Sequence, residues 1–183
     1  MGIWATSQPP DSGVIHPGMA KTLSHTISGM DINDYARDYE ESTRYFFEKF
    51  ARVTADDVDK HLSDGWSPRQ IVHHMADSET QSYARLRRLI AEPTGSVIQG
   101  YDEAMWAENP TLGYTELPIE NSIAVYKAVR AASLDILKRM QLEDLARSGV
   151  HTASGHYTML DWLRAYTNHP RAHADQMMEA IGK

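Results

Sequence analysis

Histidines are the residues of this chain whose spacing is best suited to chemistry. His169 and His173 lie four positions apart, and His73 and His74 are adjacent within the stretch WSPRQIVHHMADSE, residues 66–79. Side chains four apart on a helix project from adjacent turns of one face, so both imidazoles can reach the same ion. A third imidazole from a facing helix completes a three-histidine site with open positions, as in catalytic Zn²⁺ sites. Spacing alone does not choose between Zn²⁺ and Ni²⁺.

A helical wheel separates the two adjacent histidines. At ~100° per residue, His74 lies at the edge of the apolar face of its helix, whereas His73 lies nearly opposite. We therefore predict that His74 points into the protein and that His73 faces water. On the C-terminal helix, His169 and His173 flank the apolar face. The predicted metal ligands are His74, His169 and His173.

An alternative without metal is open for the same histidines. The chain contains nine histidines, so an H-x-x-x-H pair can arise by chance. Neutral histidines at the edge of a core would then need hydrogen-bond partners. Ser78, Gln81 and Asp175 are placed to supply some of them.

Carboxylates near the histidines are candidates for proton transfer. Asp77, Glu79 and Asp102 are predicted as catalytic residues, and Glu103 shares this possibility, because a carboxylate can act as a general base or accept a histidine N–H. The alternatives are a solvated helix face for Asp77 and a loop contact for Asp102. His151 and His156 lie in a glycine-bounded loop from which they could reach the open end of a site; the alternative is simple exposure.

The elements that would position these residues are four amphipathic helices. Apolar residues recur every three or four positions over residues 31–53, 68–91, 118–140 and 158–181, with no strand-like alternation of useful length. Ser67 followed by Pro68, and Thr158 followed by Asp161, are helix-start signals. Short helical turns are expected at residues 54–62 and 141–148. The predicted fold class is all-α, a four-helix bundle with a long crossover loop between the second and third helices.

Composition limits the domain count and the class of partner. A chain of 183 residues suits one domain, predicted at residues 31–183 after an irregular arm at residues 1–30. The net charge of −7 argues against a nucleic-acid surface, and no apolar run reaches membrane-spanning length. Without cysteine, no disulfide or thiolate ligand is possible, so any metal is held by histidines and carboxylates. We expect a cytoplasmic protein with a small-molecule substrate.

Three segments together resemble the DinB/YfiT-like superfamily. They are the WSPRQIVHHMADSE stretch, YDEAMW at residues 101–106 and HPRAH at residues 169–173, and the resemblance extends over roughly residues 31–181 and is nearest to the YfiT-like branch. It implies a four-helix bundle, a homodimer and a zinc or nickel site on His74, His169 and His173. Members resembling this chain are assigned as metal-dependent hydrolases, and others are S-transferases that use a low-molecular-weight thiol.

The chain departs from this family pattern at two positions. Pro170 lies between the two C-terminal ligands, where it removes the N–H that would bond to the Tyr166 carbonyl, so a kink or bulge is expected. Glu79 stands where near relatives commonly carry a histidine. The leading hypothesis is a metal-dependent enzyme that activates water or a small thiol. The rival hypothesis is a non-catalytic metal-binding or interaction bundle.

Overall fold

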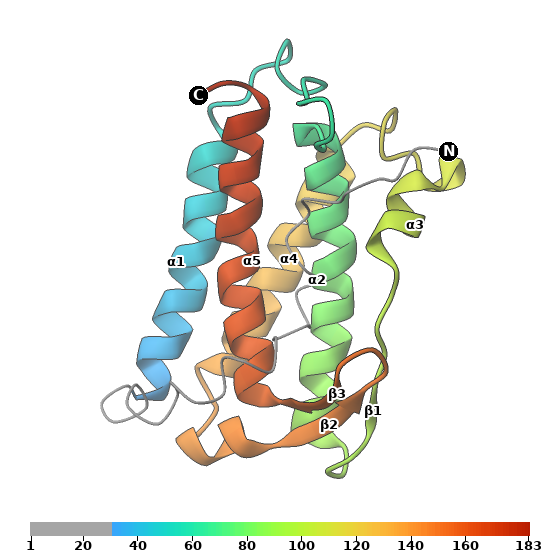
Figure 1. Ribbon diagram of the computed structural model, residues 1–183. Coiled ribbons are helices and arrows are strands. Elements are labelled where there is room, and N and C mark those ends of the chain that lie inside the picture. The colour runs from blue at the N-terminus through green and yellow to red at the C-terminus, as the bar shows by residue number, and fades with distance from the viewer. Residues whose placement is uncertain (1–30) are drawn as a thin grey trace.

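Four long helices form most of the computed structural model, which describes residues 31–183. They are α1 (Ile32–Phe50), α2 (Pro68–Ala91), α4 (Glu120–Leu137) and α5 (Met159–Ala180) (Figure 1). The arm predicted for residues 1–30 lies outside the described residues. Within the described range, no helix combines the length and the apolar character needed to cross a membrane.

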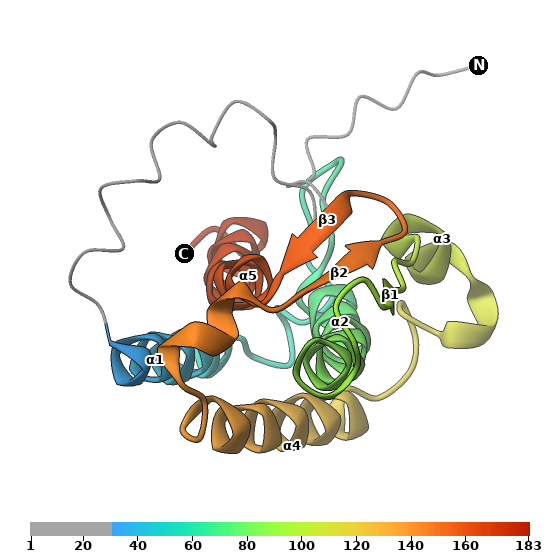
Figure 2. The same cartoon turned by 90° about the horizontal axis from the view of Figure 1, so that it is seen from below.

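The helices pack in an order that differs from their order along the chain. Seen from below in Figure 2, α1 packs against α4 and α5, and α2 packs against the same two helices from the opposite corner. In Figure 1, α1 and α5 run upward, whereas α2 and α4 run downward. Because α2 and α4 are parallel neighbours, the chain must return along the bundle between them. The predicted four-helix bundle with a long crossover is confirmed.

Local signals fix where the helices that carry the histidines begin. The Ser67 hydroxyl accepts a hydrogen bond from the Gln70 N–H, and the Gln70 side-chain oxygen accepts one from the Ser67 N–H, with Pro68 in the first turn of α2. Thr158 and Asp161 form the same reciprocal capping box at the start of α5. Both predicted helix starts are therefore confirmed.

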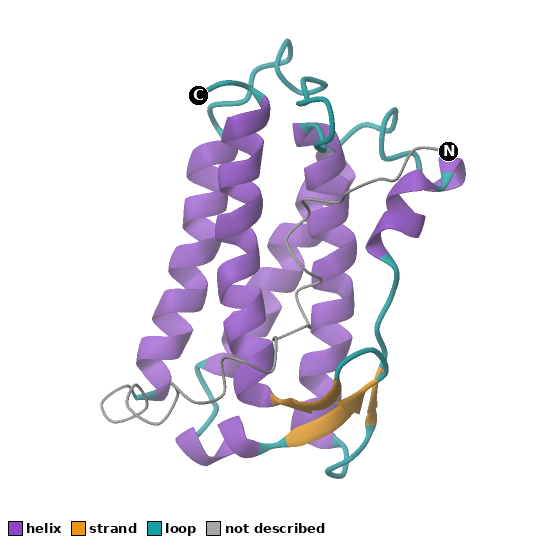
Figure 3. Ribbon diagram, viewed as in Figure 1, coloured by secondary structure: helices purple, strands orange, loops and turns teal. Residues whose placement is uncertain are grey.

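A small sheet covers one end of the bundle and was not predicted from the sequence. Strand β1 (Val97–Ile98) pairs in parallel with β2 (Ser148–His151), which pairs antiparallel with β3 (Gly155–Thr158) (Figure 3). The expectation of no strands was wrong because two- and four-residue strands are too short to show an alternating pattern. The crossover also contains the short helix α3 (Glu103–Glu108) and a 3-10 turn (Pro110–Leu112).

The helical turn expected at residues 54–62 was also wrong. These residues form hydrogen-bonded turns, and α1 ends at Phe50. The Asp57 carboxylate accepts hydrogen bonds from the Thr54 N–H and hydroxyl and from the ammonium groups of Lys60 and Lys183. Such side-chain bonds to nearby backbone compete with helix. The turn expected after the third helix is a 3-10 helix, Leu142–Ala146.

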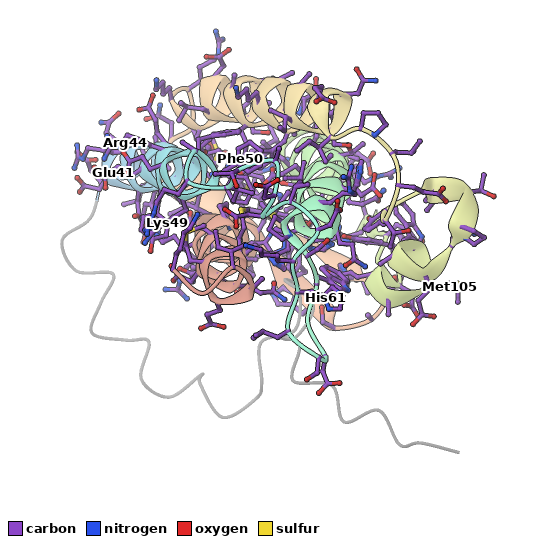
Figure 4. All side chains as sticks on the ribbon, turned by 90° about the horizontal axis from the view of Figure 1, so that it is seen from above. Glu41, Arg44, Lys49, Phe50, His61 and Met105 are labelled. Atoms are coloured by element: carbon purple, nitrogen blue, oxygen red, sulfur yellow. The ribbon has the colours of Figure 1, made fainter. Side chains whose placement is uncertain are left out.

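A buried polar layer divides the interior into two apolar clusters. Tyr39, Leu86, Leu137 and Trp162 belong to one cluster, and Phe46, Met75, Tyr126 and Met177 belong to the other. Between them, each long helix contributes buried polar side chains: Ser42 from α1, Ser78, Glu79 and Ser82 from α2, Arg130 and Ser133 from α4, and Thr167, His169 and His173 from α5. Side chains fill the space between the helices in Figure 4, where Phe50 points inward and Glu41 and Arg44 point outward.

We predict that Gly149→Ala weakens the sheet. A Cβ at Gly149 would lie 2.6 Å from the Ser96 carbonyl oxygen and 2.7 Å from Ile98 Cγ1, so strand β1 would have to move. The expected loss in free energy of unfolding is about 1–3 kcal/mol, measured by urea denaturation. Gly65→Ala is the matched control, because its Cβ would meet only Leu62 Cβ at 3.7 Å. Equal stability of the two variants would contradict this packing.

Candidate metal centre

Three histidines meet between α2 and α5. His74 lies near the start of α2, His169 lies at the middle of α5, and His173 lies one turn further along α5. One ring nitrogen from each lies within 4.8 Å of the others, and the Nε2 atoms of His74 and His169 are 2.9 Å apart. All three side chains are buried. The structure thus brings together the set predicted as ligands.

Burial keeps these imidazoles neutral. It holds the pKa of His74 and of His169 well below the usual value, and it lowers the pKa of His173 to about 4. Neighbouring imidazoles reinforce the effect, since His173 opposes a charge on His74, and both oppose one on His169. Neutral imidazole is the form that binds metal. Three neutral imidazoles whose ring nitrogens converge in a buried site suit a divalent cation, so the donor set fits a metal ion.

Two further side chains orient the cluster. His173 Nδ1 donates to Gln176 Oε1 at 2.7 Å, which leaves the lone pair on Nε2. The Trp66 ring lies 4.9 Å from the His74 ring, and it stacks almost parallel to His173 at 6.2 Å. Sequence reasoning missed both contacts, although Gln176 follows His173 by three positions on one helix. Asp175, proposed as a histidine partner, instead accepts from the Tyr45 hydroxyl.

Glu103 is the carboxylate that the crossover brings to the cluster. Its Oε2 lies 3.9 Å from His74 Nε2, the nitrogen that also faces His169. The low pKa of His74, caused by burial, means that this contact is not an ion pair between two charged groups. Glu103 is the first residue of α3. Because α3 lies beside α2 (Figure 1), it places the Glu103 carboxylate next to His74.

His73 does not face water, which corrects the prediction from the wheel. It is 6% exposed, its Nε2 donates to the Leu117 carbonyl at 3.2 Å, and its Nδ1 accepts from the Ser122 hydroxyl at 2.8 Å. The helical wheel shows only which side of α2 faces the bundle. In the structure, the crossover between α2 and α4 covers the opposite side. His73 therefore fastens the end of the crossover and the start of α4 to α2.

The predicted catalytic carboxylates have other partners. Asp77 accepts from the Tyr114 hydroxyl, Glu79 pairs with Arg130 at 3.0 Å, and Asp102 caps α3 by accepting from the Met105 N–H. Burial raises the pKa of Asp77 and of Glu79, and the hydrogen-bond partners oppose the rise. The catalytic role of these three residues stays a prediction.

The two loop histidines lie in the β2–β3 hairpin and outside the three-histidine group. His156 is exposed on β3. His151 is buried, and its Nδ1 accepts hydrogen bonds from the N–H groups of Ala153 and Ser154. His151 thus closes its own hairpin.

Sequence comparison places this chain in a known family. The sequence profile of the DinB superfamily matches residues 38–177. The chain belongs to the DinB superfamily. A protein of Oceanobacillus iheyensis, provisionally named a metal-dependent hydrolase, is 30% identical over 148 residues, which cover 80% of this chain and 84% of that protein. A second protein of that organism with the same type of name is 27% identical over 82% of this chain and 86% of its own length.

Solved structures support the superfamily fold. YfiT from Bacillus subtilis, described as a probable metal-dependent hydrolase with an unusual four-helix bundle topology, aligns with a TM-score of 0.72 at 24% identity. The alignment covers 81% of this chain and 85% of YfiT. The four-helix bundle protein TT2238 aligns with a TM-score of 0.56 at 19% identity, over 81% of this chain and 98% of TT2238. DinB/YfiT-like membership is confirmed.

We predict that the metal-free protein loses stability between pH 6.5 and pH 4. Burial lowers the pKa of His173 from 6.5 to about 4, so in this range the unfolded chain binds a proton that the folded chain does not. At about 1.4 kcal/mol per pKa unit, this group alone lowers the free energy of unfolding by about 1–3 kcal/mol. Urea unfolding with chelator at pH 7 and pH 4.5 measures the loss, and His173→Asn should reduce it. An unchanged pH dependence in that variant would exclude this origin.

Proposed function

We propose that the chain is a metal-dependent hydrolase in which His74, His169 and His173 hold one divalent ion. The observation that carries the proposal is the meeting of three buried, neutral imidazoles with ring nitrogens within 4.8 Å. A relative that is 30% identical bears a metal-dependent hydrolase name, which supports the same conclusion. Three imidazoles suit zinc and nickel alike, and they leave coordination positions for a substrate or water.

A divalent ion, when bound, supplies Lewis acidity that lowers the pKa of water or of a thiol. The side chains of the protein have three tasks around it. Gln176 fixes the tautomer of His173, Trp66 packs over the imidazoles, and Glu103 receives a proton at its carboxylate. Glu103 suits this task because its side chain is 16% exposed and lies against His74, so it faces both the cluster and the solvent side.

The proposed metal site suits two reactions, hydrolysis and thiol transfer. Because the chain has no cysteine, a thiol-transfer reaction would need a soluble low-molecular-weight thiol. Hydrolysis and thiol transfer share the need for a nucleophile with a lowered pKa. The small-molecule substrate, the cytoplasmic location and the homodimer rest on the sequence interpretation and stay predictions.

Metal content is the first test, and variants of the adjacent residues His73 and His74 form a matched pair. Protein purified without added metal should hold about one divalent ion per chain by elemental analysis, and His74→Ala should remove it because one of three ligands is lost. His73→Ala should keep the ion but lower the free energy of unfolding by about 1–3 kcal/mol, because the Leu117 carbonyl and the Ser122 hydroxyl lose their partner. Wild-type content below about 0.2 ion per chain, unchanged in His74→Ala, would refute the metal centre and favour a non-catalytic bundle.

The second test concerns Glu103 as the proton acceptor. With Zn²⁺ or Ni²⁺ added, hydrolysis of a p-nitrophenyl ester should fall about 10²- to 10⁴-fold in Glu103→Gln, with metal content retained. Glu108→Gln, in the same helix α3 but exposed, is the control and should behave as wild type. Equal activity of the two variants would remove Glu103 from the mechanism. Turnover of an electrophile only when bacillithiol, mycothiol or glutathione is added would indicate thiol transfer instead.

A further inference from the structure

Pro170 leaves a carbonyl without its helical donor, one residue after a predicted ligand. Proline has no N–H, so it cannot bond to the carbonyl four residues earlier, that of Tyr166. Helix α5 nevertheless runs from Met159 to Ala180 without interruption at Pro170. The Tyr166 carbonyl instead accepts a hydrogen bond of 2.7 Å from the Arg130 guanidinium of α4. A side chain from another helix thus occupies the place of the missing amide.

Arg130 is held so that it can make this contact. Its NH1 also donates to Glu79 Oε1 at 3.0 Å, and its NH2 donates to the Tyr39 carbonyl and to the Ser42 hydroxyl. The Nε donates to the Thr43 hydroxyl at 2.7 Å. The side chains of Arg130 and Glu79 are 2% and 0% exposed, so water does not compete for these bonds. One guanidinium therefore connects α4 with α1, α2 and α5.

The partners of Arg130 belong to the helices that carry the ligands. Glu79 lies on α2 five positions after His74, and the Tyr166 carbonyl lies on α5 three positions before His169. A buried carbonyl without a donor would favour a bend of the helix towards another donor. Such a bend at Pro170 would turn His169 and His173 away from His74. A donor held at this point supplies the Tyr166 carbonyl with a partner where the imidazoles must converge.

We propose that Glu79 and Arg130 are positioning residues for the metal centre. Glu79 holds the guanidinium, and the guanidinium replaces the missing Pro170 amide and fixes the turn of α5 that carries the histidines. The contact of the Arg130 guanidinium with the Tyr166 carbonyl is called the brace below. This inference rests on the proposed metal site. Lysine cannot substitute for Arg130, because the planar guanidinium directs five N–H groups in a fixed fork. The lysine ammonium is a compact point charge on a flexible stem and cannot reach the same set of acceptors.

The test is a double-mutant cycle between positions 130 and 170 with Co²⁺ as the probe. Arg130→Lys should weaken Co²⁺ binding about 10- to 100-fold, the range seen when groups that orient metal ligands are lost, and should alter the visible absorption of the Co²⁺ centre. Pro170→Ala restores an N–H four residues after Tyr166. In that background, Arg130→Lys should weaken binding by no more than about threefold. Equal losses in both backgrounds would overturn the proposal.

Thr43→Val is the control for a merely structural role. It removes the acceptor of the Arg130 Nε without touching Glu79 or α5. It should lower the urea midpoint and leave Co²⁺ affinity within about twofold of wild type. An affinity loss as large as that of Arg130→Lys would mean that any disturbance of Arg130 weakens the site through general stability, which would contradict the specific brace. If Arg130→Lys does not fold, Glu79→Gln/Arg130→Met takes its place in the cycle, because it removes both buried charges together.

The four proteins of the cycle are wild type, Arg130→Lys, Pro170→Ala and the double variant. They also distinguish a failure of this proposal from a failure of the metal hypothesis. If wild-type protein binds no Co²⁺, the proposed metal centre fails. The brace is then judged by the free energies of unfolding of the cycle measured in urea. Non-additive values for positions 130 and 170 support the brace, and additive values overturn it.

Discussion

The buried guanidinium of Arg130 is the interaction on which the arrangement of the helices depends. It lies in the polar layer between two apolar clusters, and its donors reach the Thr43 hydroxyl, Glu79 and the Tyr166 carbonyl on three other helices. Apolar side chains alone allow neighbouring helices to slide, since many packings bury similar area. A buried guanidinium with partners on three other helices does not allow such sliding, because each shifted register leaves a donor or an acceptor unsatisfied.

The same layer explains why histidines can form a cluster here. Burial disfavours the charged imidazolium, so His74 and His169 stay neutral although they lie side by side. Two guanidinium groups nearby, Arg85 and Arg130, add to this effect on His169. Buried polar groups need partners, and the Arg130 guanidinium finds its partners on three other helices. The candidate metal centre is therefore one edge of a larger polar network rather than an isolated group of ligands.

The parts of this structure that depend on one helix at a time could be predicted from the sequence. The starts of α2 and α5 follow from Ser67 with Pro68 and from Thr158 with Asp161, and the inward aim of His74 follows from its own wheel. The predictions that failed concern contacts with neighbouring elements, which a helical wheel does not include. His73 is buried by the crossover, and two- to four-residue strands have no readable period. At Pro170 the sequence shows the loss of an N–H from α5, but it does not show that Arg130 lies beside the Tyr166 carbonyl.

The positions of the three histidines along the chain have a consequence for the order in which the site can form. His74 and His169 are separated by 95 positions, and the last long helix to leave the ribosome is the one that carries two of the three imidazoles. A nascent chain that ends before α5 has only one of the three histidines of the group. The complete three-histidine group can therefore form only after α5 has been made and has packed against α2.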